Sequence, residues 1–252
     1  MNKHLLPKFI KEIIQHIPTL ALKSVDWKSV LIEMGPLMLK LGVRSLDDDK
    51  LLLLKNLKIS KLHFSKKLNT NISHLSALER REFGQKVLEI YFAQLKNNEG
   101  LNLDLRAKHF RFEANETYWN PNNLWLSFDS KFRQALVSLY QGFYYEDANL
   151  FADSLDLIGL TKNLNEEDTK VLVALFHNHF GPGDQTCVKF EIEKFQESFY
   201  ELFKFFMDHK VELSKDFIFL GIYLVTLYLN LEQLDCEFDV RSAFLTVFPE
   251  TL

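Results

Sequence analysis

Apolar residues recur every three or four positions through most of the chain. The spacing is first seen in residues 5–17, where leucine, isoleucine and phenylalanine occupy one side and lysine and glutamate the other. Such spacing places apolar side chains on one face of an α-helix. The same pattern predicts further helices over residues 27–34, 45–54, 77–99, 131–144, 148–158, 166–179, 195–206 and 217–231. The chain is therefore expected to be mainly α.

Polar residues at the helix starts and a glycine at a helix end support these predictions. Ser76 and Glu79 have the spacing of a capping box, and Asp147 and Asn165 can each cap a later helix. Gly159 is a suitable stop, because glycine adopts the left-handed conformation that often ends a helix. These local signals fix where the predicted helices begin and end.

Residues 101–129 depart from helical spacing. Apolar residues alternate with other residues in 110–113 and again in 124–128. Alternation with a period of two is typical of β-strands. A short β-hairpin is therefore predicted in this segment.

The chain divides at a polar stretch. Residues 58–75 lack a clear periodicity, and we interpret them as a connector. Residues 1–57 then form an N-terminal helical extension, and residues 76–252 form a helical domain.

Composition narrows the class of protein. The 23 phenylalanines, beside 9 glycines and 6 prolines, favour long helices with large apolar faces. A net charge of -4 without a basic stripe disfavours a nucleic-acid binder. The most apolar run, residues 217–231, is shorter than the roughly 20 residues of a membrane-spanning helix, so no transmembrane segment is expected. With only 2 cysteines, a reducing, cytoplasmic location is predicted.

The histidines and cysteines are assigned ordinary structural roles. His177 and His179 are two residues apart, which on a helix points them to different faces, so they are interpreted as histidines of a helix C-terminus and not as a metal pair. Cys187 and Cys236 are interpreted as small buried residues.

The segment from Gly35 to Val43 carries the first of two motifs. Gly35, Pro36, Lys40 and Gly42 occupy the positions of Gly-Pro-x-x-x-Lys-x-Gly-Gln, and Val43 replaces the glutamine. In this segment the chain resembles the N-terminal extension of the AarF/UbiB family of atypical kinases.

A second motif region follows in the order that this family has. The family's catalytic loop, Asp-Pro-His/Asn-x-x-Asn, precedes a short strand that ends in Asp-Phe-Gly. Asp104 matches the catalytic aspartate, His109 stands at the metal-binding asparagine, and Ser127 stands at the metal-binding aspartate. The chain is identified as a degenerate member of the family, in which Lys40, Asp104, His109, Ser127 and Asp129 are vestigial site residues.

The resemblance implies the helical lobe of a protein-kinase-like fold, with an N-terminal helical extension, a small hairpin at the former active site, and a nucleotide-binding lobe that is reduced or missing. No glycine follows Gly42 before Ser76 that could build a glycine-rich loop. Phosphoryl transfer requires Mg²⁺, which prefers hard oxygen ligands. His109 offers an imidazole and Ser127 a neutral hydroxyl, so no metal or cofactor is expected.

These observations predict a catalytically inactive pseudokinase that acts as a binding or regulatory protein. Because the family is tied to quinone biosynthesis and to membranes, the expected partner is a protein or a lipid-like molecule. The expected location is the cytoplasm, with peripheral association at the inner membrane face as a further expectation.

Two alternatives stay open. The first is a divergent but active kinase or ATPase that uses Mg-ATP, with Asp104 as base and Asp129, two residues beyond Ser127, as metal ligand. The second is an unrelated all-helical interaction module, in which the order of the motifs is chance.

Overall fold

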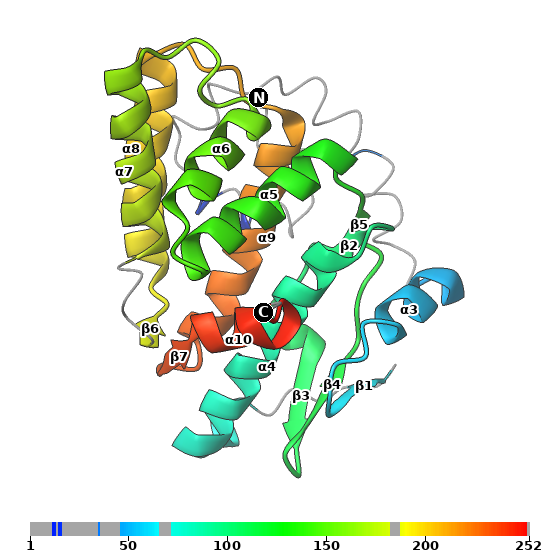
Figure 1. Cartoon of the computed structure of the whole chain (residues 1–252). Coiled ribbons are helices and arrows are strands. Elements are labelled where there is room, and N and C mark those ends of the chain that lie inside the picture. Colours follow the sequence, from blue (N-terminus) through cyan, green and yellow to red (C-terminus); the bar gives the residue numbers. More distant parts are fainter. Residues whose placement is uncertain are drawn as a thin grey trace. The chain divides into compact units, whose positions relative to one another are not determined.

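The computed structural model describes residues 12–13, 15–16, 35, 46–65, 72–181 and 187–250. Most of the predicted helix at 5–17, the helix at 27–34 and the residues from Pro36 to Val43, with Lys40 among them, lie outside this part of the chain. Helices dominate the described residues, as Figure 1 shows, so the prediction of a mainly α protein is confirmed.

The helices and strands follow one another along the chain with short connections. Among the described residues, the helices are α3 (Asp48–Lys55), α4 (Ala77–Lys96), α5 (Ser130–Tyr144), α6 (Ala148–Ile158), α7 (Glu166–Phe180), α8 (Ile192–Asp208), α9 (Lys215–Glu232) and α10 (Val240–Val247), with short 3₁₀ turns η2 (Ile72–His74) and η3 (Ala107–His109). The strands are β1 (Leu62–Phe64), β2 (Leu101–Asn102), β3 (Phe110–Glu113), β4 (Glu116–Trp119), β5 (Trp125–Leu126), β6 (Cys187–Lys189) and β7 (Glu237–Asp239).

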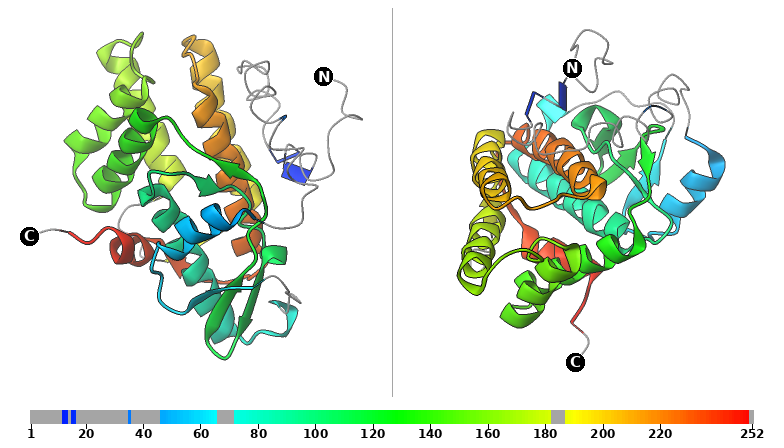
Figure 2. Two further views of the ribbon diagram at one scale, coloured as in Figure 1. Left: turned by 90° about the vertical axis from the view of Figure 1, so that its right-hand side faces the viewer. Right: turned by 90° about the horizontal axis from the view of Figure 1, so that it is seen from above.

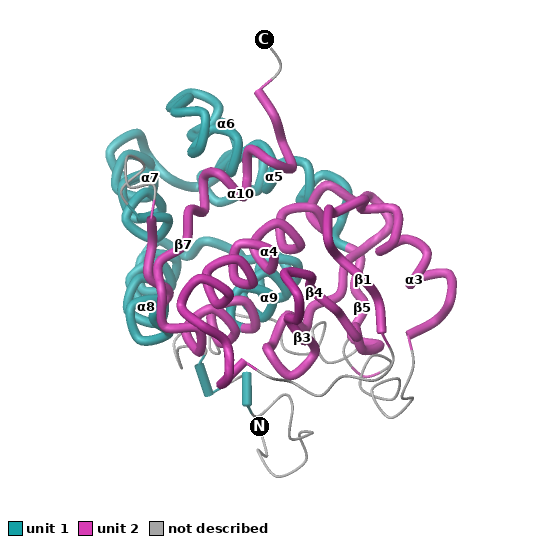
Figure 3. Tube along the Cα trace, turned by 90° about the horizontal axis from the view of Figure 1, so that it is seen from below, with its two compact units in different colours: residues 1–30, 128–185, 191–225 teal, residues 31–127, 186–190, 226–252 magenta. Residues whose placement is uncertain are grey.

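The chain forms two compact units, which Figure 3 shows in different colours. Unit 1 contains residues 1–30, 128–185 and 191–225, and unit 2 contains residues 31–127, 186–190 and 226–252. Each unit is described by itself.

Unit 1 is built from packed helices. α5 packs on α6, and α7 and α8 run side by side (Figure 2). Gly142 allows the close approach of α5 to α6, because a Cβ at this position would lie 2.5 Å from the backbone nitrogen of Phe151. The interior of unit 1 is rich in phenylalanine, and the rings of Phe199, Phe203 and Phe217 contact one another. The apolar periodicity thus becomes an aromatic core.

Unit 2 is organised around the long helix α4. Phe83, Val87 and Ile90 of this helix are fully buried. α10 packs on α4, and the ring of Phe238 lies where a side chain at Gly84 would be, 2.1 Å from a Cβ built there. A larger residue at position 84 would push this ring away.

In the described residues of unit 2, the strands form three small sheets. β1, β4 and β3 form a three-stranded sheet in that order, β2 pairs with β5, and β6 pairs with β7. β3 and β4 are antiparallel and are joined at Ala114 and Asn115, which both have positive φ angles of 51° and 62°. Two consecutive left-handed residues are the geometry of a tight hairpin turn.

The predicted hairpin is confirmed, but its second strand is β4. Residues 124–128, which the alternation assigned to the hairpin, instead contain β5, and this strand pairs with β2. The range interpreted as a connector contains β1, which runs parallel to β4. Neither pairing has a local sequence signal, because both join segments far apart in the chain.

The predicted helix starts agree closely with the structure. Ser76 and Glu79 form the complete capping box of α4, and Asp147 and Asn165 cap α6 and α7 with their side chains. Gly159 ends α6 in the left-handed conformation. α4 ends at Lys96, before the predicted stop at Gly100, and α3 begins at Asp48 and not near residue 45.

The lengths and polarity of the helices also test the prediction that no transmembrane segment is present. In the described parts of the chain, every helix is too short or too polar to pass through a bilayer.

Candidate functional site

Two loops of unit 2 meet beside the hairpin. Residues 103–109 connect β2 to β3, and residues 120–124 connect β4 to β5. Because β2 pairs with β5 and β3 pairs with β4, the two loops are held together at both ends. Leu103 N–H donates to Leu124 O at 2.9 Å, and Asn120 N–H donates to His109 O at 2.9 Å.

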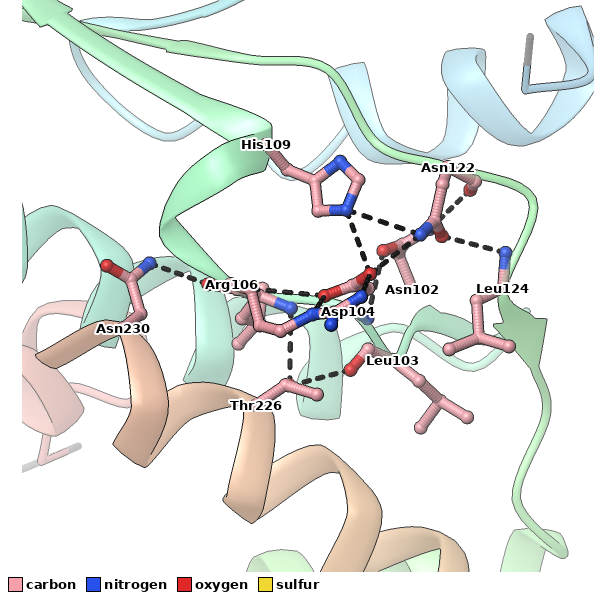
Figure 4. A network of polar contacts seen from close by, with 10 residues as sticks. Asn102, Leu103, Asp104, Arg106, His109, Asn122, Leu124, Thr226 and Asn230 are labelled. Atoms are coloured by element: carbon pink, nitrogen blue, oxygen red, sulfur yellow. Dashed lines mark hydrogen bonds and ion pairs between the residues drawn. The ribbon is translucent and has the colours of Figure 1, made fainter. Parts of the chain in front are cut away.

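Asp104 is the centre of the first loop, and its side chain has no exposed surface. Its Oδ2 accepts hydrogen bonds from His109 Nε2 and from Asn122 Nδ2, each at 2.8 Å, as Figure 4 shows. Arg106 donates from Nε to Oδ1 and from Nη2 to Oδ2, also at 2.8 Å each. Asp104, Arg106, His109 and Asn122 are called the Asp104 cluster below.

The Asp104 cluster keeps its carboxylate charged. Burial alone would raise the pKa of Asp104, because it disfavours the charged form. Hydrogen bonds from Arg106 and His109, together with the positive charge of Arg106, outweigh burial and hold the pKa of Asp104 well below its usual value. A fully buried carboxylate is thus ionised because its partners are fixed in place.

The two loops are ordered by further amide contacts. Asn122 accepts from Leu124 N–H through its side-chain oxygen at 2.9 Å, so the amide that donates to Asp104 is held in one orientation. Asn102 donates to Asn122 O at 2.6 Å and accepts from Asp104 N–H at 3.2 Å. Gln94 of α4 in turn accepts from Asn102 N–H at 2.7 Å.

The part of α9 in unit 2 supplies a third support. Thr226 donates to Leu103 O at 2.7 Å and accepts from Leu105 N–H at 3.2 Å. Asn230 donates to Leu105 O at 2.6 Å. Both side chains are fully buried, and they satisfy backbone groups that would otherwise be buried without partners. The loop around Asp104 is therefore rigid on its buried side.

The structure brings together two of the predicted site residues, Asp104 and His109. Ser127 is not part of the Asp104 cluster, because its hydroxyl donates to Glu99 O at 2.9 Å. Asp129 belongs to unit 1, where its side chain accepts from the N–H groups of Lys131 and Phe132 at the start of α5. Lys40 lies outside the described residues.

Sequence reasoning missed Arg106 and Asn122. In a kinase catalytic loop the metal-binding asparagine follows the aspartate by five residues, and this spacing did find His109. Residues 124–128 were interpreted as the strand before the metal-binding aspartate, which led to Ser127. In the structure the hairpin ends with β4, and Asn122 comes shortly after that strand. The Asn-Pro-Asn-Asn run at 120–123 is a loop signal that could have revealed this.

The histidines and cysteines that the sequence assigned to structural roles, His179, Cys187 and Cys236 among them, are not members of the Asp104 cluster. His179 lies 2.9 Å from Ser198 Oγ, and burial lowers its pKa to about 4. The prediction for the cysteines was wrong for Cys187, which is exposed because β6 is a short strand at the surface, and Cys236 is half-buried. In the described ranges no three histidine, cysteine, aspartate or glutamate side chains are grouped to hold a metal ion.

Two open clefts of unit 2 lie apart from the Asp104 cluster. One, of about 830 Å³, is lined by residues of α3, α4 and α10 and of the segments that follow α3 and α4. The other, of about 550 Å³, is lined by residues of α4, the β3–β4 hairpin, β6 and β7. None of the four cluster residues lines either cleft.

No family model matches this chain, and neither does any curated protein. The resemblance to the AarF/UbiB family stays a prediction from the sequence motifs and their order.

Proposed function

We propose that this protein is a catalytically inactive relative of the AarF/UbiB kinases that acts by binding. The proposal is supported by the order of the elements: strand β2, the loop with Asp104, a hairpin, the loop with Asn122, and strand β5 paired back to β2. In this proposal Asp104, His109 and Asn122 correspond to the catalytic aspartate and to the two metal-binding residues of a kinase.

The composition of the Asp104 cluster carries the proposal. Of the three side chains at these positions, only Asp104 is a carboxylate. His109 offers an imidazole and Asn122 an amide, which already donates to Asp104. Kinases hold the magnesium ions that neutralise the triphosphate through an aspartate and an asparagine, and magnesium demands hard oxygen ligands in octahedral geometry. These residues do not fit a magnesium ion, so phosphoryl transfer has no metal centre here.

The glycines of the chain and the elements ahead of α4 give a second reason to propose an inactive protein. The nine glycines of the chain include no G-x-G-x-x-G loop of the kind that covers the phosphates of ATP. Ahead of α4, the described residues contribute α3, the three-residue strand β1 and the turn η2. A cradle for ATP is not among them.

The proposed role is that of a binding or regulatory partner. The resemblance to the AarF/UbiB family favours a protein or a lipid-like molecule as the ligand, a place in quinone or lipid metabolism, and a cytoplasmic location with peripheral contact to the inner membrane face. The ordered loops of the Asp104 cluster serve as a fixed scaffold in this role.

A thermal-shift series with ATP, with Mg²⁺ and with both together tests the proposal, combined with an ATP turnover assay. We expect the same Tm in all conditions and turnover at the level of a heat-inactivated sample. Turnover attributable to the protein would overturn the proposal.

The alternative of an active kinase is tested with the variant Asp129→Ala. It requires that Mg-ATP raise the Tm and that Asp129→Ala abolish this rise. Because Asp129 also caps α5, the matched control is Asp147→Ala, which removes the equivalent cap of α6. A rise that is lost in Asp129→Ala and retained in Asp147→Ala would establish the active enzyme.

A further inference from the structure

Residues 50–78 are a basic segment in an otherwise acidic chain. Between Asp49 and Glu79 the sequence contains no aspartate and no glutamate, and it contains six lysines: Lys50, Lys55, Lys58, Lys61, Lys66 and Lys67. Because the whole chain has a net charge of -4, this local excess of positive charge does not show in the composition. A surface with one sign of charge attracts partners of the opposite sign.

Two of these lysines are exposed at the end of α3. Lys55 is the last residue of the helix, and Lys58 follows shortly after it. Neither side chain has an acidic partner among the residues that the structure describes. Lys58 also has a left-handed backbone, with a φ angle of 51°. This conformation favours glycine over lysine, so Lys58 is not placed there for local stability.

Lys58 lines the cleft of about 830 Å³ in unit 2, which we call the α3 cleft. Lys86 and Lys96 of α4 line it as well. Its apolar lining consists of Leu53, Leu57, Ile59, Ala93 and Val247. Lys58 and Lys96 are exposed, whereas the apolar residues are buried or half-buried. The α3 cleft thus has an apolar lining below a rim that carries positive charge.

Two carboxylates also line the α3 cleft, but they do not reverse its charge. Glu89 forms an ion pair with Lys86, and Glu99 is exposed. Lys96 donates to the uncharged Val247 O, at 2.9 Å, so its positive charge is not neutralised by this contact. The cleft therefore keeps an excess of positive charge.

Of the possible partners, an acidic amphipathic helix fits this surface best. Its apolar face can cover the apolar lining of the α3 cleft, while carboxylates at the edges of that face meet the lysines. A flat bilayer cannot enter a cleft, and the phosphates of a nucleic acid would meet Glu89 and Glu99. A small ligand needs a more enclosed site, because such pockets cover most of the ligand surface.

We propose that the α3 cleft, together with Lys55 and Lys58 at the end of α3, binds an acidic amphipathic helix of a partner protein. The inference rests on the proposed function, in which the protein acts by binding. It adds the surface that binds and the class of partner.

The experiment measures fluorescence anisotropy of a labelled helical peptide with the full-length protein. The probe has about 18 residues, with leucine at every third or fourth position and glutamate elsewhere. We expect saturable binding that weakens about tenfold when NaCl is raised from about 0.05 M to about 0.5 M. A second peptide, with glutamine in place of every glutamate, should bind at least about tenfold more weakly.

Two double variants locate the site. Lys55→Glu/Lys58→Glu should weaken binding of the acidic peptide by about tenfold or more. The matched control is Lys131→Glu/Lys204→Glu, which makes the same change of charge at two exposed lysines of unit 1 and should bind like the wild type. Because all four lysines are exposed, the Tm of both variants should stay near that of the wild type.

A change within the α3 cleft tests its apolar lining. Ile59→Gln adds no charge and places a polar group in that lining, so it should weaken binding about fivefold. If this variant does not fold, the lysine variants and the two peptides still decide.

Three results overturn the inference. The first is equal binding of the glutamate and glutamine peptides, and the second is equal affinity in the two double variants. The third is a protein that ignores the peptide but binds vesicles with anionic lipid, or a single-stranded oligonucleotide, through Lys55 and Lys58. No nucleotide triphosphate is present, so each of these failures is separate from ATP turnover, which tests the proposed function.

Discussion

Asp104 in unit 2 and His179 in unit 1 are titratable side chains with lowered pKa values, but one is charged and the other neutral at pH 7. Asp104 is charged, because Arg106, His109 and Asn122 donate to its oxygens. His179 has Ser198 Oγ at 2.9 Å, and its ring is surrounded by the rings of Phe180, Phe195 and Phe199 with centroids at 5.1 to 5.9 Å.

The partners of the two groups decide the difference. Burial penalises the charged form of each group. At Asp104 the fixed donors outweigh that penalty and lower the pKa. At His179 burial acts without a compensating charge, lowers the pKa to about 4 and keeps the ring neutral at pH 7. The groups that face a titratable side chain therefore decide whether it is charged, as Asp104 is, or neutral, as His179 is.

The largest expected effect on the free energy of unfolding comes from removing the negative charge of Asp104. Asp104→Asn keeps the shape of the side chain but leaves the guanidinium of Arg106 buried without a counter-charge. Breaking a buried pair in this way costs roughly 3–5 kcal/mol of unfolding free energy. Urea denaturation at pH 7 measures it.

An exposed ion pair provides the control for that variant. Lys170 and Glu166 are 2.7 Å apart on the surface of α7, with side chains 73% and 86% exposed. Glu166→Gln should change the unfolding free energy by less than about 0.5 kcal/mol. If Asp104→Asn were as mild as this, the Asp104 cluster would not be the rigid, charge-balanced site described above.

The second prediction uses the pH dependence of the unfolding free energy to test the surroundings of His179. The pKa of His179 is about 4 in the folded protein and near 6.5 when unfolded, so the unfolded chain binds the extra proton between these values. The stabilising contribution is complete above pH 6.5 and is lost as the pH falls toward 4. From pH 7 to pH 5 this amounts to roughly 2 kcal/mol of unfolding free energy.

His179→Phe should remove most of that pH dependence. Burial also lowers the pKa of His177, so a smaller slope of the same sign should remain. An unchanged slope in His179→Phe would show that the aromatic surroundings do not keep the ring neutral.

Local sequence signals predicted unit 1 well. The caps Asp147 and Asn165 and the stop at Gly159 act within a few residues of where they stand, and the structure confirms all three. The apolar face of α8 was likewise visible, because its spacing is a property of one segment. Even so, the environment of His179 was not predictable, since it depends on side chains from a second helix.

The Asp104 cluster was predicted only in part, for a physical reason. Asp104 and His109 are linked by a fixed spacing within one loop. Asn122 depends on which segment pairs with β3, and Thr226 of α9, which holds the loop, lies more than one hundred residues away and looked like part of an apolar helix. Arg106 was overlooked because charged residues are expected at the surface, and only the partner shows why this one is buried.

The smallest effect concerns the one polar contact that His179 makes among the residues the structure describes. Ser198→Ala removes the hydroxyl at 2.9 Å from Nδ1 and leaves a polar ring atom among phenylalanine rings, which should cost about 1 kcal/mol of unfolding free energy at pH 7. Ser154→Ala is the matched control in the same unit: Ser154 also lies in a helix and donates to a backbone oxygen of its own helix, that of Leu150, as Ser198 does to Phe195. Such back-bonds contribute little to stability, so a loss confined to Ser198→Ala would assign the energy to His179. Equal losses in the two variants would mean that the ring is held by its aromatic neighbours alone, and the contrast with the hydrogen-bonded Asp104 would then be sharper still.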